Sequence, residues 1–178
     1  AGATDKNPWL DESGANTPDL MDGMVPVVYS GNTWVVANQE EWYNYDRQVW
    51  ANAVLVNDEN LRTATEGTPI PEEKVLAYYV WIPRYKYKLF NAEKEMGTDS
   101  YNAQNTGIDI VFENETSSTG TVSCSISDIG VETCENAVNG NYYTHPAFWW
   151  DKDSDRVRDN GEELTGIWVG KFEISSSN

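Results

Sequence analysis

An acidic segment near the end of the sequence carries the side chains best suited to chemistry. The segment WWDKDSDRVRDNGEEL, residues 149–164, spaces its carboxylates in the pattern D-x-D-x-D-x-x-x-D-x-x-E. A calcium loop of the EF-hand type takes carboxylate oxygens at alternating positions, one backbone carbonyl and a final glutamate. The residues at those positions are Asp151, Asp153, Asp155, Val157, Asp159 and Glu162. The spacing therefore indicates calcium as the candidate cofactor.

The same segment also fits a solvated, charged hairpin tip that holds no metal. Arg156 stands where an EF-hand loop needs glycine for its sharp turn. Lys152, Arg156 and Arg158 can neutralise the carboxylates without any ion. The flanking residues have the pattern of strands rather than helices, which argues against a true EF-hand. Two interpretations stay open: a calcium-binding β-loop and a charged hairpin tip.

The two cysteines, Cys124 and Cys134, lie in a segment rich in Ser, Thr and Gly. A disulfide between them would close a short loop, which stabilises a fold by roughly 2 to 3 kcal/mol. We favour this disulfide over the alternative of two free, buried thiols. A zinc site lacks two further ligands, since His145 is the only histidine.

Aromatic side chains could form a ligand-binding surface. Tryptophan and tyrosine rings that face solvent can stack on sugar rings. The segment EWYNYDRQVW is the best candidate for such a platform, through Trp42, Tyr43, Tyr45 and Trp50. The alternative is that these rings fill the core, because a β domain with few phenylalanines must use its other large aromatics there. The core interpretation is the stronger of the two.

The sequence gives no sign of a catalytic site, and we expect a protein without enzymatic activity. His145, in YTHPAF, has no nucleophile or paired carboxylate near it in sequence and is expected to make structural hydrogen bonds. Arg84, Lys86 and Lys88 alternate with aromatic residues along one predicted strand. We expect these cations to pair with carboxylates on a neighbouring strand or domain.

The elements that would position these side chains are predicted to be mainly β. In MVPVVYSGNTWVV, Gly31 and Asn32 favour a hairpin, because both tolerate the positive φ of a tight turn. Further strands are expected in residues 50–56, 76–90, 107–113, 116–128 and 164–175, and one helical turn at 71–75. The fold class is therefore mainly β, with antiparallel hairpins and sheet, long irregular loops and little helix.

Composition divides the chain into three expected parts. Residues 1–20 form a flexible linker or tether, 21–57 an N-terminal β-hairpin module and 58–178 the principal β domain. The apolar run GIWVGKFEIS leads straight into SSN, so we expect the chain to be part of a longer protein.

Charge limits the classes of partner. Twelve Lys and Arg against 29 Asp and Glu give a net charge of −17, which opposes nucleic acid and anionic membranes. No apolar run is long enough for membrane insertion of this segment. Such acidity is typical of a secreted or cell-surface protein, so an extracellular location is expected. The expected partner is a glycan or protein ligand at a surface, or copies of the chain itself.

Several motifs in order resemble a known family. PDLMDGMVPVVY, WYNYD, WANAVLV, YYVWIPRYKYKLF, YTHPAF and ELTGIWVGKFE resemble surface or secreted proteins of Gram-positive bacteria, some of them pilin-like or prophage-encoded. The resemblance covers roughly residues 17–174 and implies architecture and a surface location rather than an activity.

A weaker resemblance concerns two strands. YVWIPRYKY and GIWVGKFEIS are similar to the opening strands of the C-type lectin fold in its formylglycine-generating-enzyme-like version. That scaffold continues with a long core after the second strand, whereas this chain stops at Asn178. Its catalytic cysteines have no counterpart in Cys124 and Cys134, so the resemblance implies no enzymatic activity.

Together these features predict a non-catalytic extracellular module of a bacterial surface protein that acts in adhesion or ligand display and is stabilised by calcium in one interpretation. The first alternative is a structural subunit of a pilus, filament or phage tail, which would assemble through strand edges at 24–36 and 167–174. The second is a glycan-binding domain.

Overall fold

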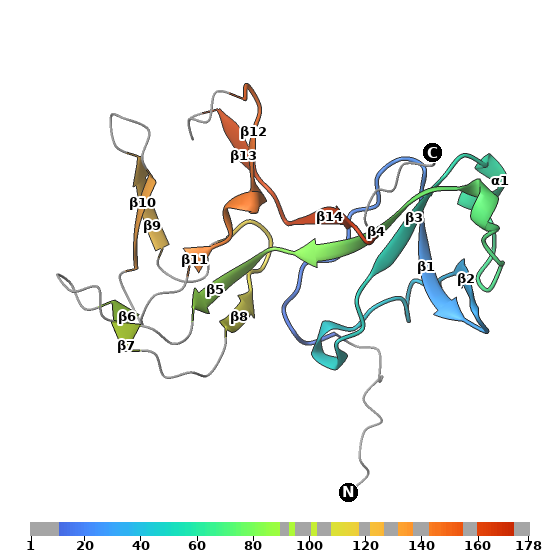
Figure 1. The fold of residues 1–178 in the computed structure, drawn as a ribbon, viewed down its shortest axis with the longest axis horizontal. Coiled ribbons are helices and arrows are strands. Elements are labelled where there is room, and N and C mark those ends of the chain that lie inside the picture. The colour runs from blue at the N-terminus through green and yellow to red at the C-terminus, as the bar shows by residue number, and fades with distance from the viewer. Residues whose placement is uncertain are drawn as a thin grey trace, which may run out of the picture. The chain divides into compact units, whose positions relative to one another are not determined.

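A computed structural model describes residues 11–89, 93–94, 101–102, 108–117, 122–126, 132–136, 143–154 and 160–172 (Figure 1). The chain is mainly β with antiparallel pairing and little helix, which confirms the predicted fold class. The strands are β1 (Met24–Ser30), β2 (Thr33–Val36), β3 (Asn52–Val56), β4 (Val75–Pro83), β5 (Tyr85–Leu89), β6 (Glu93–Lys94), β7 (Tyr101–Asn102), β8 (Ile108–Phe112), β9 (Val122–Ile126), β10 (Glu132–Asn136), β11 (Tyr143–Thr144), β12 (Trp149–Asp151), β13 (Gly161–Glu163) and β14 (Gly166–Gly170). The helices are α1 (Glu59–Arg62) and the 3-10 turns η1 (Tyr45–Arg47), η2 (Glu72–Lys74) and η3 (Pro146–Phe148).

The chain forms two compact units. The first consists of Ala1–Ser13, Thr17–Ile82 and Trp168–Asn178, and the second of Gly14–Asn16 and Pro83–Ile167. The predicted boundary between residues 57 and 58 differs from this division. It falls inside the first unit because β3 and β4, on either side of it, are hydrogen-bonded neighbours in one sheet.

The predicted tether also differs from the structure over its described part, residues 11–20. Asn16 is buried, and the Asp11 carboxylate accepts a hydrogen bond from the Tyr45 backbone N–H at 2.9 Å. A segment poor in apolar residues can still be held in place, because its polar side chains can bond to backbone groups of the folded chain. Residues 1–10 lie outside the described residues.

The first predicted hairpin is confirmed. β1 and β2 pair with Tyr29 opposite Trp34 and Ser30 opposite Thr33. The two turn residues, Gly31 and Asn32, have φ values of 58° and 67°. Positive φ at both positions defines the tight turn whose twist matches that of paired strands.

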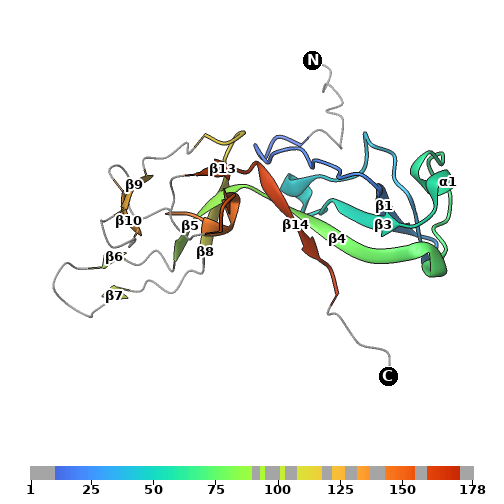
Figure 2. The same ribbon diagram turned by 90° about the horizontal axis from the view of Figure 1, so that it is seen from above.

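A five-stranded sheet in the order β14-β4-β3-β1-β2 organises the first unit. Figure 2 shows its strands β14, β4, β3 and β1. One of its faces carries a valine-rich cluster of Val25, Val27, Val36, Val54, Val56 and Ile70. Alternation along β1 puts Tyr29 on the same face as Val25 and Val27. Tyr78 also lies on this face, since it is directly opposite Val54.

The second unit is built from smaller sheets. β5 is the central strand of a three-stranded sheet in the order β11-β5-β8, while β12 pairs with β13 and β9 with β10. Phe148 in η3 is 1% exposed and contacts the Tyr85 ring edge to face, with 5.3 Å between centroids. His145 is the N-cap residue of η3, where its Nδ1 accepts a hydrogen bond from the Ala147 N–H at 3.2 Å. This is a structural hydrogen bond of the kind expected for His145.

Candidate functional site

The acidic segment forms a β-hairpin, with β12 and β13 on either side of its loop. Asp151 accepts a hydrogen bond from the Ser154 N–H at 2.9 Å, and Asp153 accepts one from the Asn160 side chain at 3.1 Å. Glu162 forms an ion pair with Lys152 at 2.9 Å. Among the described residues, no group of three or more His, Cys, Asp and Glu side chains could hold a metal ion. Asp155, Val157 and Asp159 lie outside the described residues.

The register of this hairpin separates two of the predicted calcium ligands. Asp151 is opposite Gly161, and Trp150 is opposite Glu162. Successive side chains of a strand point to opposite faces, so Asp151 and Glu162 lie on different faces of the ribbon. A calcium ion bound at one face would therefore not use both carboxylates, and this register favours the charged hairpin tip.

Calcium binding stays a prediction, which thermal unfolding in EDTA and then in rising calcium would test. A site present only in the folded state raises Tm, because binding adds about 2.7 kcal/mol when calcium is at ~100 Kd. Asp153→Ala should abolish this rise. Asp22→Ala, which removes an exposed carboxylate outside the hairpin, should preserve it. An unchanged wild-type Tm at millimolar calcium would assign the carboxylates to the charged tip.

The backbone brings the two cysteines into register. Cys124 and Cys134 are directly opposite each other in the antiparallel pair β9 and β10. Directly opposed residues have Cα atoms about 4.5 to 5.5 Å apart, which lies within the range that a disulfide spans. The register supports the predicted disulfide, which stays a prediction.

The predicted aromatic platform is largely part of the core. Trp42 is 5% exposed and Tyr45 6% exposed. The Trp42 indole N–H donates to the Asn52 carbonyl at 2.8 Å, and the Tyr45 hydroxyl donates to the Trp81 carbonyl at 3.1 Å. Burial raises the pKa of Tyr45 above its usual value. Tyr43 is buried in part, which leaves Trp50, at 43% exposed, as the most accessible ring of this set. The core interpretation therefore holds for Trp42 and Tyr45.

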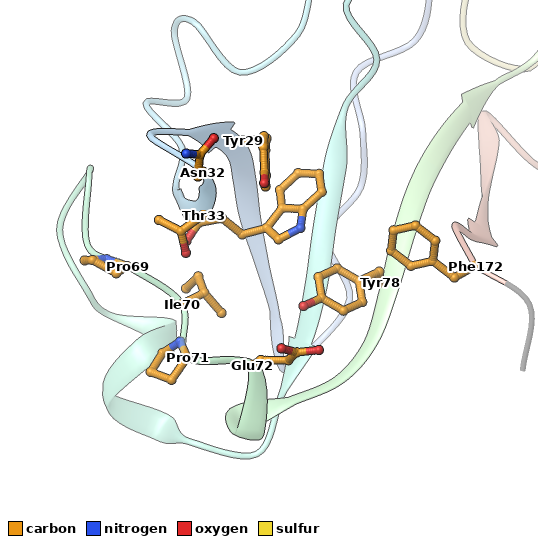
Figure 3. Close-up of a pocket in the computed structure, with 10 residues that line it drawn as sticks. Tyr29, Asn32, Thr33, Pro69, Ile70, Pro71, Glu72, Tyr78 and Phe172 are labelled. Carbon is orange, nitrogen blue, oxygen red and sulfur yellow. The ribbon is translucent and has the colours of Figure 1, made fainter. Parts of the chain in front are cut away.

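An aromatic pocket of about 580 Å³ opens elsewhere in the first unit, next to the valine-rich cluster (Figure 3). Four aromatic rings, two prolines, an isoleucine and three polar side chains line it: Tyr29, Trp34, Tyr78, Phe172, Pro69, Pro71, Ile70, Asn32, Thr33 and Glu72. The β1–β2 hairpin supplies the Tyr29 and Trp34 rings, β4 supplies Tyr78, and Phe172 follows β14. The segment after α1 forms the opposite wall. Its backbone bonds to β2, where the Ile70 N–H donates to the Trp34 carbonyl at 2.9 Å.

The four rings of the aromatic pocket form a connected series. Tyr29 meets Trp34 at 5.2 Å and 67°, and Tyr78 meets Phe172 at 5.3 Å and 78°. Trp34 and Tyr78 link the two pairs at 5.9 Å. Tyr29 is 62% exposed and Phe172 is 59% exposed, so both ends of the series face solvent.

Polar groups lie at defined points around the aromatic pocket. Burial raises the pKa of Tyr78, and the nearby Glu72 carboxylate raises it further, so the hydroxyl stays protonated and able to donate. The Lys171 ammonium lies 5.5 Å from the centroid of the Trp34 ring and donates to the Asn52 side chain at 2.6 Å. In the part of the chain that the structure describes, the hydroxyls of Tyr29 and Tyr78 and the indole N–H of Trp34 bond to no protein group. These groups are available to a ligand.

The second unit contains a buried polar cluster. Arg84 and Glu113 are 1% and 0% exposed, and the Arg84 Nε donates to the Glu113 carboxylate at 3.0 Å. Arg84 also pairs with Glu163 on β13, and the Thr144 hydroxyl donates to Glu113 at 3.1 Å. The prediction that Arg84 pairs with carboxylates from other strands is confirmed. The positive charge of Lys86 also acts on Glu113, since it lowers the pKa of that carboxyl. The Lys88 side chain lies outside the described residues.

Asn16 joins this buried polar cluster. Its Nδ2 donates to the carbonyls of Glu113, Glu115 and Thr165 at 3.0, 2.8 and 2.8 Å. Its Oδ1 accepts from the Glu115 N–H at 2.6 Å. One amide side chain therefore ties three segments of the second unit together, which assigns the cluster a structural role.

The buried polar cluster makes stability depend on pH. Burial raises the pKa of Glu113 from its ordinary value of 4.5, although Arg84 and Thr144 oppose the shift. A carboxyl with a raised folded-state pKa contributes most stability below its unfolded pKa and loses that contribution as pH rises through the folded value. As pH rises from the unfolded-state pKa of Glu113 to its folded-state pKa, we expect the unfolding free energy of the wild type to fall relative to that of Glu113→Gln. Urea titrations at several pH values would measure it. If wild type and Glu113→Gln lost stability in parallel as pH rises, Glu113 would not be the source of the pH dependence. The same conclusion would follow if Glu115→Gln, at an exposed carboxylate, changed the pH dependence as much as Glu113→Gln.

Sequence analysis did not predict the aromatic pocket, although the hairpin pattern was enough to predict that two of its rings are neighbours. The two-residue turn at Gly31 and Asn32 makes Tyr29 and Trp34 neighbours across the hairpin. The nearness of Tyr78 and Phe172 to this pair depends on the order of strands in the sheet, which local pattern does not reveal.

A scan against protein-family models finds no match, and comparisons with curated proteins and with solved structures find no significant match. The two resemblances described above therefore stay predictions. Within the described ranges, every helix is too short or too polar to cross a bilayer.

Proposed function

We propose that this chain is a non-catalytic extracellular module of a bacterial surface protein and that it binds a ligand in adhesion or ligand display. The observation that carries the proposal is the aromatic pocket of the first unit. Pockets for small ligands are concave, about 300 to 1,000 Å³ in volume, and mostly apolar with a few polar groups. The aromatic pocket, at about 580 Å³, has this size and this lining.

Exposure of the rings supports a binding role. Burying a large aromatic side chain stabilises a fold because apolar surface is removed from water. Tyr29 and Phe172 contribute little of this stabilisation, since both rings stay on the surface. Exposed apolar rings that are gathered in one place are typical of surfaces that bind a partner. The net charge of −17 and the opposed cysteines fit an extracellular setting, where solubility and oxidation are both favoured.

Assembly through strand edges is the second candidate function. The two predicted edge regions contain β2 and β14, which are the outermost strands of the five-stranded sheet. The backbone of residues 67–70 is already hydrogen-bonded to β2, through Val36 N–H to Thr68 and Ile70 N–H to Trp34. β14 is therefore the edge that this alternative would use, by adding a strand from another copy.

Binding and sedimentation measurements on the whole chain test the proposal together. A ligand-binding module should sediment as a monomer over a wide concentration range and should bind saturably to members of a panel of extracellular glycans and peptides. Tyr29→Ala should weaken that binding and should leave the monomer intact. Concentration-dependent assembly without saturable binding would favour the structural subunit, and turnover of any panel member would contradict a non-catalytic role.

A further inference from the structure

The aromatic pocket presents rings and hydrogen-bonding groups in a combination that narrows the chemistry of its ligand. The exposed rings of Tyr29 and Phe172 stand at the two ends of the ring series (Figure 3). The face of an aromatic ring carries partial negative charge, so it attracts the positively polarised C–H bonds of a flat, saturated ring. Sugar rings and proline rings both offer such C–H faces.

Hydrogen bonding distinguishes these two kinds of ligand. The indole N–H of Trp34 is a donor, the Glu72 carboxylate is an acceptor, and the amide of Asn32 is both. Each hydroxyl of a sugar both donates and accepts, so vicinal hydroxyls can satisfy donors and acceptors alike. A proline-rich segment has no N–H at its prolines and offers mainly carbonyl acceptors, which leaves Glu72 without a partner. The lining of the aromatic pocket therefore fits a saccharide better than a polyproline segment.

Charge on the protein indicates which saccharides, neutral or anionic, the aromatic pocket would bind. Glu72 places a negative charge in the wall of the aromatic pocket, and the chain as a whole carries −17. Lys171 lies near this pocket, with its ammonium 5.5 Å from the centroid of the Trp34 ring and hydrogen-bonded to the uncharged Asn52 side chain. The Glu72 carboxylate would repel an anionic sugar that lies against its part of the wall, so a neutral sugar fits better there.

We propose that the aromatic pocket binds a short segment of a neutral glycan, with Tyr29 and Phe172 stacking on sugar rings and Glu72 accepting hydrogen bonds from hydroxyls. This inference rests on the proposed function, since it names the ligand class of the same site. The volume of about 580 Å³ limits the bound portion to a few sugar units at most, so longer glycans bind through an end or a short internal stretch.

Two panels tested side by side examine this inference, one of neutral and anionic glycans and one of proline-rich peptides. We expect saturable binding to neutral glycans by the wild type. Tyr29→Ala and Phe172→Ala should each lower the affinity about tenfold or more, since one stacked ring is lost. Glu72→Gln should lower it by about tenfold, because a hydrogen bond to a charged acceptor is replaced by a neutral one. Trp150→Ala, which removes a 54% exposed ring in the second unit, should leave the affinity unchanged.

The outcomes separate the failure of this inference from the failure of the proposed function. Peptide binding that is lost in Tyr29→Ala would overturn the glycan inference and keep the ligand-binding module. A preference for anionic glycans would show that the ligand is not neutral and would leave the assignment of a glycan to this pocket in place. Glycan binding that survives in Tyr29→Ala and Phe172→Ala, both folded by circular dichroism, would overturn the assignment to this pocket. An absence of binding across both panels would count against both proposals.

Discussion

Arg84→Met is expected to lower the free energy of unfolding by about 3 to 5 kcal/mol. Arg84 is 1% exposed and is the cation that Glu113 contacts at 3.0 Å. Its removal leaves the Glu113 carboxyl buried beside Thr144 with no cation bonded to it. Methionine fills most of the arginine volume, so the loss measures the broken pair more than a cavity. Urea unfolding followed by circular dichroism would give the difference.

Two further variants show whether the loss comes from the uncompensated charge. Arg84→Met combined with Glu113→Leu removes both buried charges and should recover much of the stability, as replacing a whole buried pair by apolar residues often does. Lys152→Met breaks an ion pair whose two side chains are 44% and 55% exposed, and should cost no more than about 1 kcal/mol. If Arg84→Met lost as little stability as Lys152→Met, the claim that the buried Arg84–Glu113 pair stabilises the fold would be wrong.

Trp42→Ala is expected to destabilise the protein by about 3 to 5 kcal/mol and to leave ligand affinity per folded molecule unchanged. Trp42 is 5% exposed, stacks on Trp168 at 6.3 Å between centroids, and donates its indole N–H to the Asn52 carbonyl. Truncation therefore opens a cavity and leaves a partly buried carbonyl without this donor. Chemical unfolding and a binding titration on the same preparation would separate the two effects.

Trp50→Ala is the matched control, because Trp50 belongs to the same sequence segment and is 43% exposed. Its loss should cost ~1 kcal/mol, the order of one aromatic contact, here with Tyr45 at 5.3 Å. A binding defect in the Trp42 and Trp50 variants with little loss of stability would restore the platform predicted from EWYNYDRQVW and would contradict the core assignment.

Local patterns predicted much of the fold. Gly31 and Asn32 tolerate the positive φ that their hairpin turn requires. The alternation of basic and aromatic residues predicted that β5 is a strand. These signals are local because backbone dihedrals and pleat are set by a few neighbouring residues. The division into units was not predictable in this way, since it depends on β14 returning to the sheet of the first unit.

The candidate site was harder to predict for a similar reason. Trp42 and Tyr29 are both aromatic residues in β-rich segments, yet one is buried and the other is 62% exposed. The difference arises from what covers each ring, and for Trp42 this includes Trp168, far away in the sequence. Asn16 shows the same limit, because its burial depends on carbonyls supplied by residues 113, 115 and 165.

Two-dimensional ¹H–¹⁵N spectra of the tryptophan indoles test the central claim most directly, that the aromatic pocket is the ligand-binding site. The Trp34 resonance can be assigned by its loss in Trp34→Phe and the Trp150 resonance by its loss in Trp150→Phe. The account predicts that titration with the glycan and peptide panels shifts the Trp34 indole signal saturably while the Trp150 signal stays fixed. A Trp34 signal that does not move with any member, or a saturable shift confined to Trp150, would contradict it.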